Sequence, residues 1–212
     1  MPSYDAVLFD FGGVFTASPF GAIELAEERH GAAPGQLREI IFGAYDRDDD
    51  HPWHRLERGE IGLGPAREAI IELGRGAGFE IDPIRLLIEG MGAHETREDL
   101  IGLVKRIRAD GVRTALVTNN VREFGDGWRK LVPVEALFDE VVDSSAEGCR
   151  KPDPAIFELA LERVGAVSPA RSIFLDDFHG NIDAARALGI ESILVEPDHR
   201  PALRSLERLL GY

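Results

Sequence analysis

Apolar runs of strand length alternate with helix-length stretches over most of the chain. The first run, residues 6–9, is continuous rather than alternating, which is typical of a strand buried on both faces of a sheet. It ends in Asp10, and two glycines follow at once. Beyond residue 97 the pattern predicts strands at 112–118, 138–143, 172–177 and 190–195, and helices at 100–107, 154–164, 181–188 and 201–210.

The order of these elements predicts the fold class. Strands that alternate with helices along a chain form a parallel sheet with helices on both faces. We therefore expect an α/β fold, a doubly wound parallel sheet of the Rossmann-like kind with five core strands.

Residues 21–93 have a different pattern, with helical periodicity and no convincing strand. Helices are expected near 21–31, 34–45, 65–73 and 83–91. The stretch 46–60 between them is polar, and its aspartate-rich run at 46–50 is expected to be a solvated loop. The sequence thus predicts a helical insertion between the first and second strands of the sheet.

Polar residues gather where the predicted strands end. Asp10 follows the first strand, Thr118 ends the second, and Asp176 and Asp177 end the fourth. Ligands of open α/β sheets bind at the carboxyl ends of the strands. We therefore expect these side chains, with those of the loop around Lys151, to form one site.

Composition and charge narrow the range of partners. The chain has 212 residues, of which 44% are hydrophobic, and a formal net charge of −14. This charge argues against nucleic acid or an anionic membrane as the main partner, because both bind basic surfaces. Cys149 is the single cysteine, so no internal disulfide is possible. With no signal-like start and no apolar run long enough to span a membrane, we expect a cytoplasmic protein.

The carboxylates predicted at the strand ends point to a hard cation. Asp10, Asp176 and Asp177 would repel one another unless a cation neutralised them. Oxygen ligands of this kind suit Mg²⁺, which takes one or two carboxylates and completes its shell with water and phosphate oxygens.

The neighbouring groups suit a phosphoryl group. Thr118 offers a hydroxyl, the chain around Phe11 and Asn119 offers backbone amides, and Lys151 offers a positive charge that also keeps Asp10 ionised. These groups together support phosphoryl transfer, in which positioning and charge stabilisation supply most of the catalysis. A carboxylate can itself be the nucleophile, which gives an aspartyl-phosphate intermediate.

The chain resembles the haloacid dehalogenase-like hydrolase superfamily. The family's four motifs occur in order, as Asp10-Phe-Gly-Gly-Val14, Val117-Thr-Asn-Asn120, Arg150-Lys-Pro-Asp153 and Phe174-Leu-Asp-Asp177. The likeness covers the whole chain and is strongest to the phosphatase subgroup that includes the N-terminal domain of soluble epoxide hydrolase. It implies a core domain of residues 1–14 plus 95–212 and a helical cap of residues 15–94.

The resemblance also implies roles for single residues. Asp10 would be the nucleophile and a metal ligand, the Gly12 carbonyl a second ligand, and Asp177 a third. Asp176 would bind the metal directly or through water. Thr118 and Asn119, with the Phe11 amide, would hold the phosphoryl group, and Lys151 would neutralise it and Asp10. The family's strand order would place the first strand between those that end in Thr118 and Asp177.

One position departs from the family pattern. Most phosphatases of the family carry a second Asp two residues after the nucleophile, where it protonates the leaving group, and this chain has Gly12. General acid–base catalysis typically contributes about 10² to 10⁴-fold. Candidate substitutes are Asp46, His51, His54 and His179, although each is expected to be an ordinary surface residue. Arg150 is expected either to add positive potential at the site or to form a surface salt bridge.

Three functions follow from these residues. The leading hypothesis is a Mg²⁺-dependent phosphatase for a small phosphorylated metabolite, with sugar phosphates among the candidates. The alternatives, both prompted by Gly12, are a metal-free dehalogenase of the same fold and a non-catalytic protein that binds a phosphorylated ligand or a partner. The chain is expected to be a monomer or a homodimer, and its cap carries no pattern that identifies the substrate.

Overall fold

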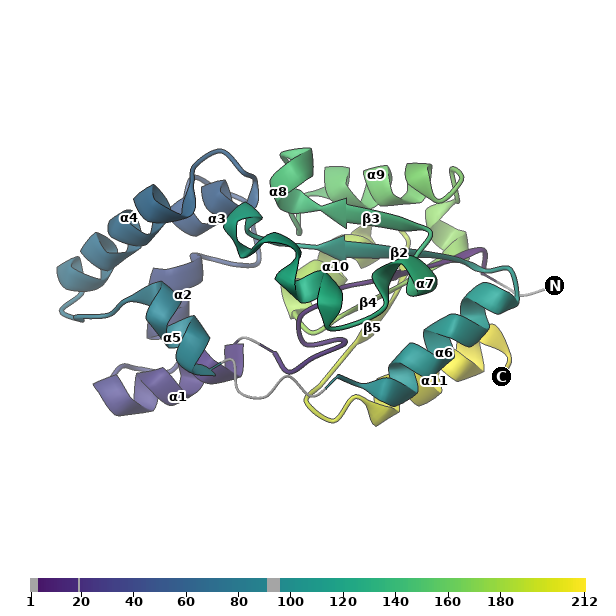
Figure 1. Ribbon diagram of the computed structural model, residues 1–212, viewed down its shortest axis with the longest axis horizontal. Helices are drawn as coiled ribbons and strands as arrows, with labels where there is room; N and C mark the ends of the chain where they lie inside the picture. Colours follow the sequence, from purple (N-terminus) through teal and green to yellow (C-terminus); the bar gives the residue numbers. More distant parts are fainter. Residues whose placement is uncertain (1–3, 19, 91–95) are drawn as a thin grey trace.

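A five-stranded parallel sheet forms the centre of the protein (Figure 1). The computed structural model describes residues 4–18, 20–90 and 96–212. The strand order is β3-β2-β1-β4-β5, and every neighbouring pair is parallel. The strands are β1 (Ala6–Phe9), β2 (Arg113–Thr118), β3 (Glu140–Asp143), β4 (Ser172–Asp176) and β5 (Glu191–Leu194). The predicted fold class is confirmed, and so is the position of β1 between β2 and β4.

The first strand is central and completely buried. All four residues of β1 have no solvent-exposed surface, which explains why the apolar run is continuous. Its last residue, Phe9, lies opposite Leu116 of β2 and Leu175 of β4. The three strands therefore end at nearly the same level, and the residues that follow them meet at one edge of the sheet.

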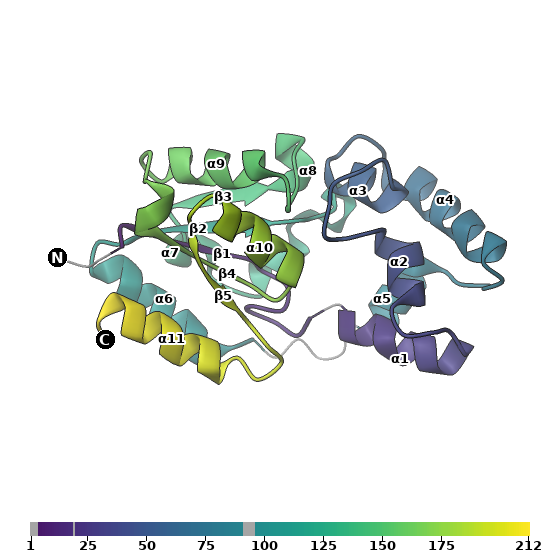
Figure 2. The same cartoon turned by 180° about the vertical axis from the view of Figure 1, so that it is seen from behind.

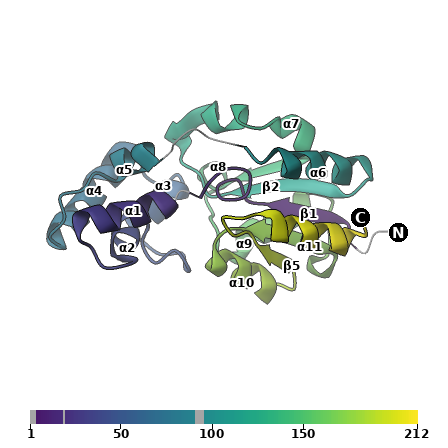
Figure 3. The same ribbon diagram turned by 90° about the horizontal axis from the view of Figure 1, so that it is seen from below.

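Two layers of helices cover the sheet. Alternate residues of β1 face opposite sides, so that Val7 and Phe9 belong to one apolar cluster and Ala6 and Leu8 to the other. The first cluster is completed by α6 (Glu98–Ala109), α7 (Val134–Leu137) and α11 (Arg200–Leu210), and the second by α9 (Pro154–Arg163) and α10 (His179–Ala187). Figure 2 shows α10 in front of the sheet, and Figure 3 shows α6 and α10 on opposite sides of it.

A second lobe contains the helices that lie between β1 and α6 in the chain (Figure 1). They are α1 (Phe20–His30), α2 (Gln36–Phe42), α3 (Pro52–Glu57), α4 (Leu63–Gly76) and α5 (Pro83–Gly90), and they share an apolar core of their own. Residue 91, where the last of these helices was expected to end, and the expected boundary between residues 94 and 95 lie outside the described residues.

The aspartate run at 46–50 is a loop, as expected, whereas the polar residues that follow it contain the helix α3 (Pro52–Glu57), which the pattern did not predict. Pro52 occupies the first turn of α3, where its missing N–H is not needed. The side chain of His51 accepts a hydrogen bond from Trp53 N at 3.2 Å and caps the helix. Trp53 and Leu56 then enter the core of the lobe. A polar composition concealed a short helix that a histidine cap and two apolar residues stabilise.

Smaller elements complete the core. The stretch 121–132 was expected to be partly helical and broken by glycines, and it contains the 3₁₀ segment η1 (Arg122–Lys130) with a kink at Gly125. A one-turn helix, α8 (Ser144–Glu147), follows β3, and the 3₁₀ turn η2 (Pro169–Arg171) precedes β4. In the described part of the chain, no helix has the length and apolar character that a membrane span requires.

The packing of α9 on the sheet gives a stability prediction. Phe157 of α9 is fully buried, and its ring centroid lies 5.1 Å from that of Phe174 in β4. We expect Phe157→Ala to lower the free energy of unfolding by about 3–5 kcal/mol, because it leaves a cavity in the core. Leu25→Ala, at a side chain that is 57% exposed, is the control and should change it by less than about 0.5 kcal/mol. Urea denaturation followed by circular dichroism measures both, and equal effects would contradict the assignment of this core.

Candidate active site

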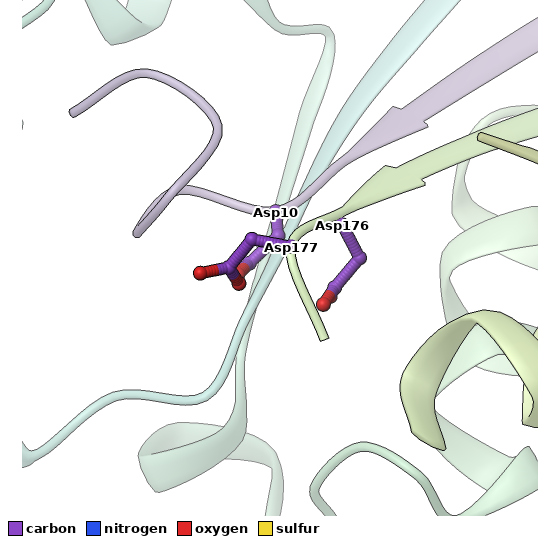
Figure 4. Close-up of side chains that lie close together, drawn as sticks. All are labelled: Asp10, Asp176 and Asp177. Carbon is purple, nitrogen blue, oxygen red and sulfur yellow. The ribbon is translucent and has the colours of Figure 1, made fainter. Parts of the chain in front are cut away.

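Three carboxylates meet at the carboxyl edge of the sheet (Figure 4). Asp10 follows β1, Asp176 is the last residue of β4, and Asp177 comes next. One carboxylate oxygen from each lies within 4.8 Å of the others. Figure 4 shows the carboxylates of Asp10 and Asp177 side by side, whereas that of Asp176 points in another direction. The predicted gathering of these acids is therefore what the fold produces.

A buried lysine connects two of the acids. Lys151 is almost fully buried, and its Nζ lies 2.7 Å from Asp10 Oδ1 and 2.7 Å from Asp176 Oδ2. Asp176 also accepts hydrogen bonds from Phe178 N at 2.8 Å and from Asn181 Nδ2 at 3.1 Å. These donors fix the Asp176 carboxylate in place, and its contact with Nζ holds the ammonium beside Asp10.

The other two acids share an environment that disfavours their charges. Burial raises the pKa of Asp10 to about 7, with Lys151 opposing and Asp176 adding to the rise. Burial, followed by repulsion from Asp176 and Asp10, raises the pKa of Asp177 to about 8. A cation bound between Asp10 and Asp177 would lower both pKa values. Carboxyl groups with pKa values perturbed in this way are typical of functional sites.

Gly13 allows Asp177 to reach its position, a role that sequence reasoning did not assign. Its φ of +70° is left-handed, and a Cβ at this residue would lie 2.0 Å from Asp177 Oδ2. Only glycine fits both the backbone angle and the close approach. The Ser18 hydroxyl donates a hydrogen bond to the same Asp177 carboxylate. The glycine pair after Asp10 was the available signal, whereas nothing local pointed to Ser18.

The predicted phosphate-binding residues lie at the carboxyl ends of β1 and β2, and Asn119 also contacts the lysine. Thr118 ends β2 beside β1 and is nearly buried. The Asn119 side chain accepts from Lys151 N at 2.8 Å and donates to Lys151 O at 3.0 Å, so it holds the lysine backbone. The Phe11 ring packs against Trp128 in the core, while its amide donates to the Asp10 carboxylate. Gly12 lies in the turn that follows.

The proposed substitutes for the missing acid lie in different places. His54 is fully buried, so the expectation of a surface residue is wrong, and burial and then Arg150 lower its pKa to about 4. His51 caps α3, and the Asp46 backbone packs against Gly180. Of the four candidates, His179 lines the cavity beside Asp177.

Arg150 also differs from the expectation. It is fully buried rather than part of a surface salt bridge, and its Nε lies 2.7 Å from Glu57 Oε2 in the helical lobe. Burial alone would lower the pKa of Arg150, but Glu57 and Tyr45 keep it above its usual value. Arg150 therefore connects the two lobes, while its neighbour Lys151 faces the acids.

A cavity of about 440 Å³ opens beside Asp177 between the two lobes. It is lined by the apolar side chains of Ala17, Phe20, Phe178 and Val195 and by the charged side chains of Glu24, Arg38 and Glu196, among others. A space of this size is typical of small-molecule sites.

Comparison with known proteins gives the family. The family model of haloacid dehalogenase-like hydrolases matches residues 4–189. The chain is 36% identical over 99% of its length to mouse acyl-CoA dehydrogenase family member 10, of which it covers 19%. It is 28% identical over 96% of its length to mouse bifunctional epoxide hydrolase 2, of which it covers 38%. It is 26% identical over 99% of its length to the sesquiterpene phosphatase astK of Aspergillus oryzae, of which it covers 98%.

Solved structures show the same fold. A HAD family enzyme from Bacteroides thetaiotaomicron in complex with magnesium and inorganic phosphate has a TM-score of 0.63 at 21% identity and covers 92% of this chain and 96% of its own. A dehalogenase has a TM-score of 0.65 at 20% identity and covers 100% and 99%, respectively. The predicted family and the predicted likeness to an epoxide hydrolase are both confirmed, and the chain belongs to the haloacid dehalogenase-like hydrolases.

Proposed function

We propose that the protein is a Mg²⁺-dependent phosphatase that hydrolyses a small phosphorylated metabolite through an aspartyl-phosphate intermediate. The observation that carries this proposal is the buried Lys151, which lies 2.7 Å from Asp10 while Asp177 faces the same space. A carboxylate, a fixed cation and a second carboxylate at one strand edge are the groups that phosphoryl transfer to an aspartate requires.

The carboxylate pair fits Mg²⁺. Asp10 and Asp177 lie side by side with raised pKa values, and a divalent cation would relieve their repulsion. These two carboxylates and the Gly12 carbonyl would hold the ion. Asp176 already accepts from Lys151, Phe178 and Asn181, so its proposed role is to orient the lysine. When bound, the ion would neutralise charge on the phosphoryl oxygens.

The residues of the chain would then carry out two displacements. Asp10 would attack phosphorus, forming a carboxylate–phosphorus bond as the bond to the leaving oxygen breaks, and water would later cleave the acyl phosphate. Lys151, the Thr118 hydroxyl and the Asn119 amide would stabilise the phosphoryl oxygens during both steps. The Asn119 side chain is already engaged with Lys151, so we assign this contact to its backbone.

The leaving group would occupy the cavity beside Asp177, between the sheet and the helical lobe. In this proposal the lobe is the cap, within residues 15–94, and the core is formed by residues 1–14 plus 95–212. Because Gly12 cannot donate a proton, His179 and solvent are the available acids. A good leaving group would need little help from either.

The relatives support a phosphatase over a dehalogenase. The relative of nearly the same length is named a sesquiterpene phosphatase, and its match covers both chains almost completely. The dehalogenase of similar fold is 20% identical, so it supports the architecture and not the reaction. The acid pair beside Asp10 favours a cation, and thus phosphate chemistry, over a metal-free reaction.

The nucleophile gives the most direct prediction. Asp10→Asn should reduce phosphate release from p-nitrophenyl phosphate by about 10⁴-fold or more, because an amide is not a nucleophile at phosphorus. EDTA should abolish the wild-type activity and Mg²⁺ should restore it. Asp183→Asn, on the exposed surface of α10, is the matched control. Full activity in Asp10→Asn would exclude this mechanism, and EDTA-insensitive halide release from a haloacid would favour the dehalogenase.

The raised pKa of Asp177 gives a pH prediction. This carboxyl has a folded-state pKa of about 8, above its ordinary value, so its stabilising effect is present at low pH and is lost as pH rises toward 8. Without divalent cations, Asp177→Asn should therefore become more stable relative to wild type between pH 4 and 8. Adding Mg²⁺ at pH 8 should stabilise wild type but not the variant. Thermal unfolding measures this difference, and parallel pH profiles would contradict the assignment.

The absence of an acid at Gly12 predicts a steep dependence on the leaving group. Aryl phosphates should be hydrolysed faster than alkyl phosphates by about 10² to 10⁴-fold in kcat, because no side chain at Gly12 protonates the departing oxygen. Gly12→Asp should reduce this ratio, whereas Gly12→Asn, which has the same size, should not. Steady-state kinetics with a series of monoesters measures the ratio. A flat dependence in wild type would show that another residue supplies the proton.

A further inference from the structure

The loop that places Lys151 beside the acids also contacts the helical lobe, through the preceding residue Arg150. Arg150 is fully buried, and its Nε donates to Glu57 Oε2 of α3 at 2.7 Å. Its Nη1 donates to Arg47 O at 3.3 Å, and its guanidinium lies 4.8 Å from the centre of the Tyr45 ring. One peptide bond therefore joins a residue enclosed by the helical lobe to the lysine beside Asp10.

Glu57 is the centre of these contacts. It is 3% exposed and accepts hydrogen bonds from three donors: Arg150 Nε, Trp53 Nε1 at 2.7 Å and Tyr45 OH at 3.0 Å. A buried carboxylate requires such partners, because an unpaired one would be strongly destabilising. The orientation of Glu57 is thus fixed by its own lobe before the lobe contacts the core.

The contacts close into a ring that includes the candidate site. Tyr45 OH accepts from Asn119 Nδ2 at 3.4 Å, and Asn119 binds both the N–H and the C=O of Lys151. Starting at Glu57, the ring passes through Arg150, Lys151, Asn119 and Tyr45 and returns to Glu57. The loops after β2 and β3, which carry the proposed phosphate-binding groups, are therefore both held by one glutamate of the helical lobe.

The helical lobe also packs closely on the core next to Glu57. Gly59, two residues beyond Glu57, has a φ of +67°, and a Cβ there would lie 2.4 Å from the backbone oxygen of Ser145. Leu63 N donates to Glu123 Oε1 at 2.8 Å. The α3–α4 connection thus lies directly against α8 and η1 of the core.

We propose that Glu57 and Arg150 are positioning residues, through which the fit of the helical lobe on the core sets the place of Lys151 and Asn119. Neither residue touches the reacting atoms in this scheme. This inference rests on the proposed phosphatase function, since it concerns the placement of that reaction's lysine. It gives a reason for the buried ion pair that lies next to the lysine.

The test separates positioning from stability with a double variant. Glu57→Gln leaves Arg150 with only the longer Asp48 contact of 3.4 Å, and Arg150→Met leaves the buried Glu57 without its cation, so each should lower the melting temperature. Glu57→Gln combined with Arg150→Met leaves neither charge, and the Gln oxygen still accepts from Trp53 and Tyr45. We expect the double variant to regain most of the melting temperature while its kcat with p-nitrophenyl phosphate stays about tenfold or more below wild type.

A binding measurement gives a readout that stability alone would not change. With Mg²⁺ present, calorimetry should show weaker binding of inorganic phosphate to the double variant. In a Lys151→Met background, the same two substitutions should cause a smaller further loss of phosphate affinity, because one of the two groups that they position is already absent. Glu68→Gln, an exposed glutamate of α4, is the matched control and should equal wild type. If the two substitutions weakened phosphate binding by the same factor in the Lys151→Met background as in wild type, the proposal would be overturned.

Tyr45→Phe tests the same coupling with a smaller change, which is useful if the double variant does not fold. Tyr45→Phe keeps the ring and removes the hydroxyl between Asn119 and Glu57, and it should lower kcat about threefold to tenfold. Wild-type kcat in Tyr45→Phe, or in a well-folded double variant, would overturn the inference and leave the phosphatase function intact. An inactive wild type would instead refute the function. Hydrogen exchange at the Lys151 amide would then decide the coupling, with faster exchange in the variants supporting it and unchanged exchange overturning it.

Discussion

The ammonium of Lys151, enclosed between Asp10 and Asp176, is the interaction on which the rest of the site depends. A lysine with almost no exposed surface is stable only beside negative charge, and the strand order β2-β1-β4 supplies it from two neighbouring strands. The same charge opposes the rise that burial causes in the pKa of Asp10 and so favours its nucleophilic, anionic form. The strand order thus brings together the acids that make a buried ammonium stable, and the same acids include the proposed nucleophile.

The loop between β3 and α9 makes this arrangement depend on both lobes. Lys151 faces the acids, whereas Arg150 lies among side chains of the helical lobe. In the proposed enzyme, the lobe that encloses the leaving group would also support the groups that hold the phosphoryl. Substrate selection and phosphoryl stabilisation would then share a framework, although their residues are far apart in the sequence.

Much of the core could be predicted because its signals are local. Continuous apolar runs mark buried strands, and polar residues at their ends, such as Asp10 and Asp177, mark the functional edge. The helix α3, the buried His54 and the pairing of Arg150 with Glu57 were missed because each depends on contacts between distant segments. Gly13 is intermediate: the glycine pair was visible, but its reason is the side chain of a residue over 160 positions away.

The two consecutive aspartates at the end of β4, Asp176 within the strand and Asp177 just after it, limit how this chain can change in length. Successive side chains of a strand point to opposite faces, so Asp176 meets Lys151 while Asp177 meets Gly13. Inserting or deleting one residue within β4 would exchange these directions and deprive the ammonium of its partner. We therefore expect this chain to tolerate a change of length in its surface connections but not between Ser172 and Asp177.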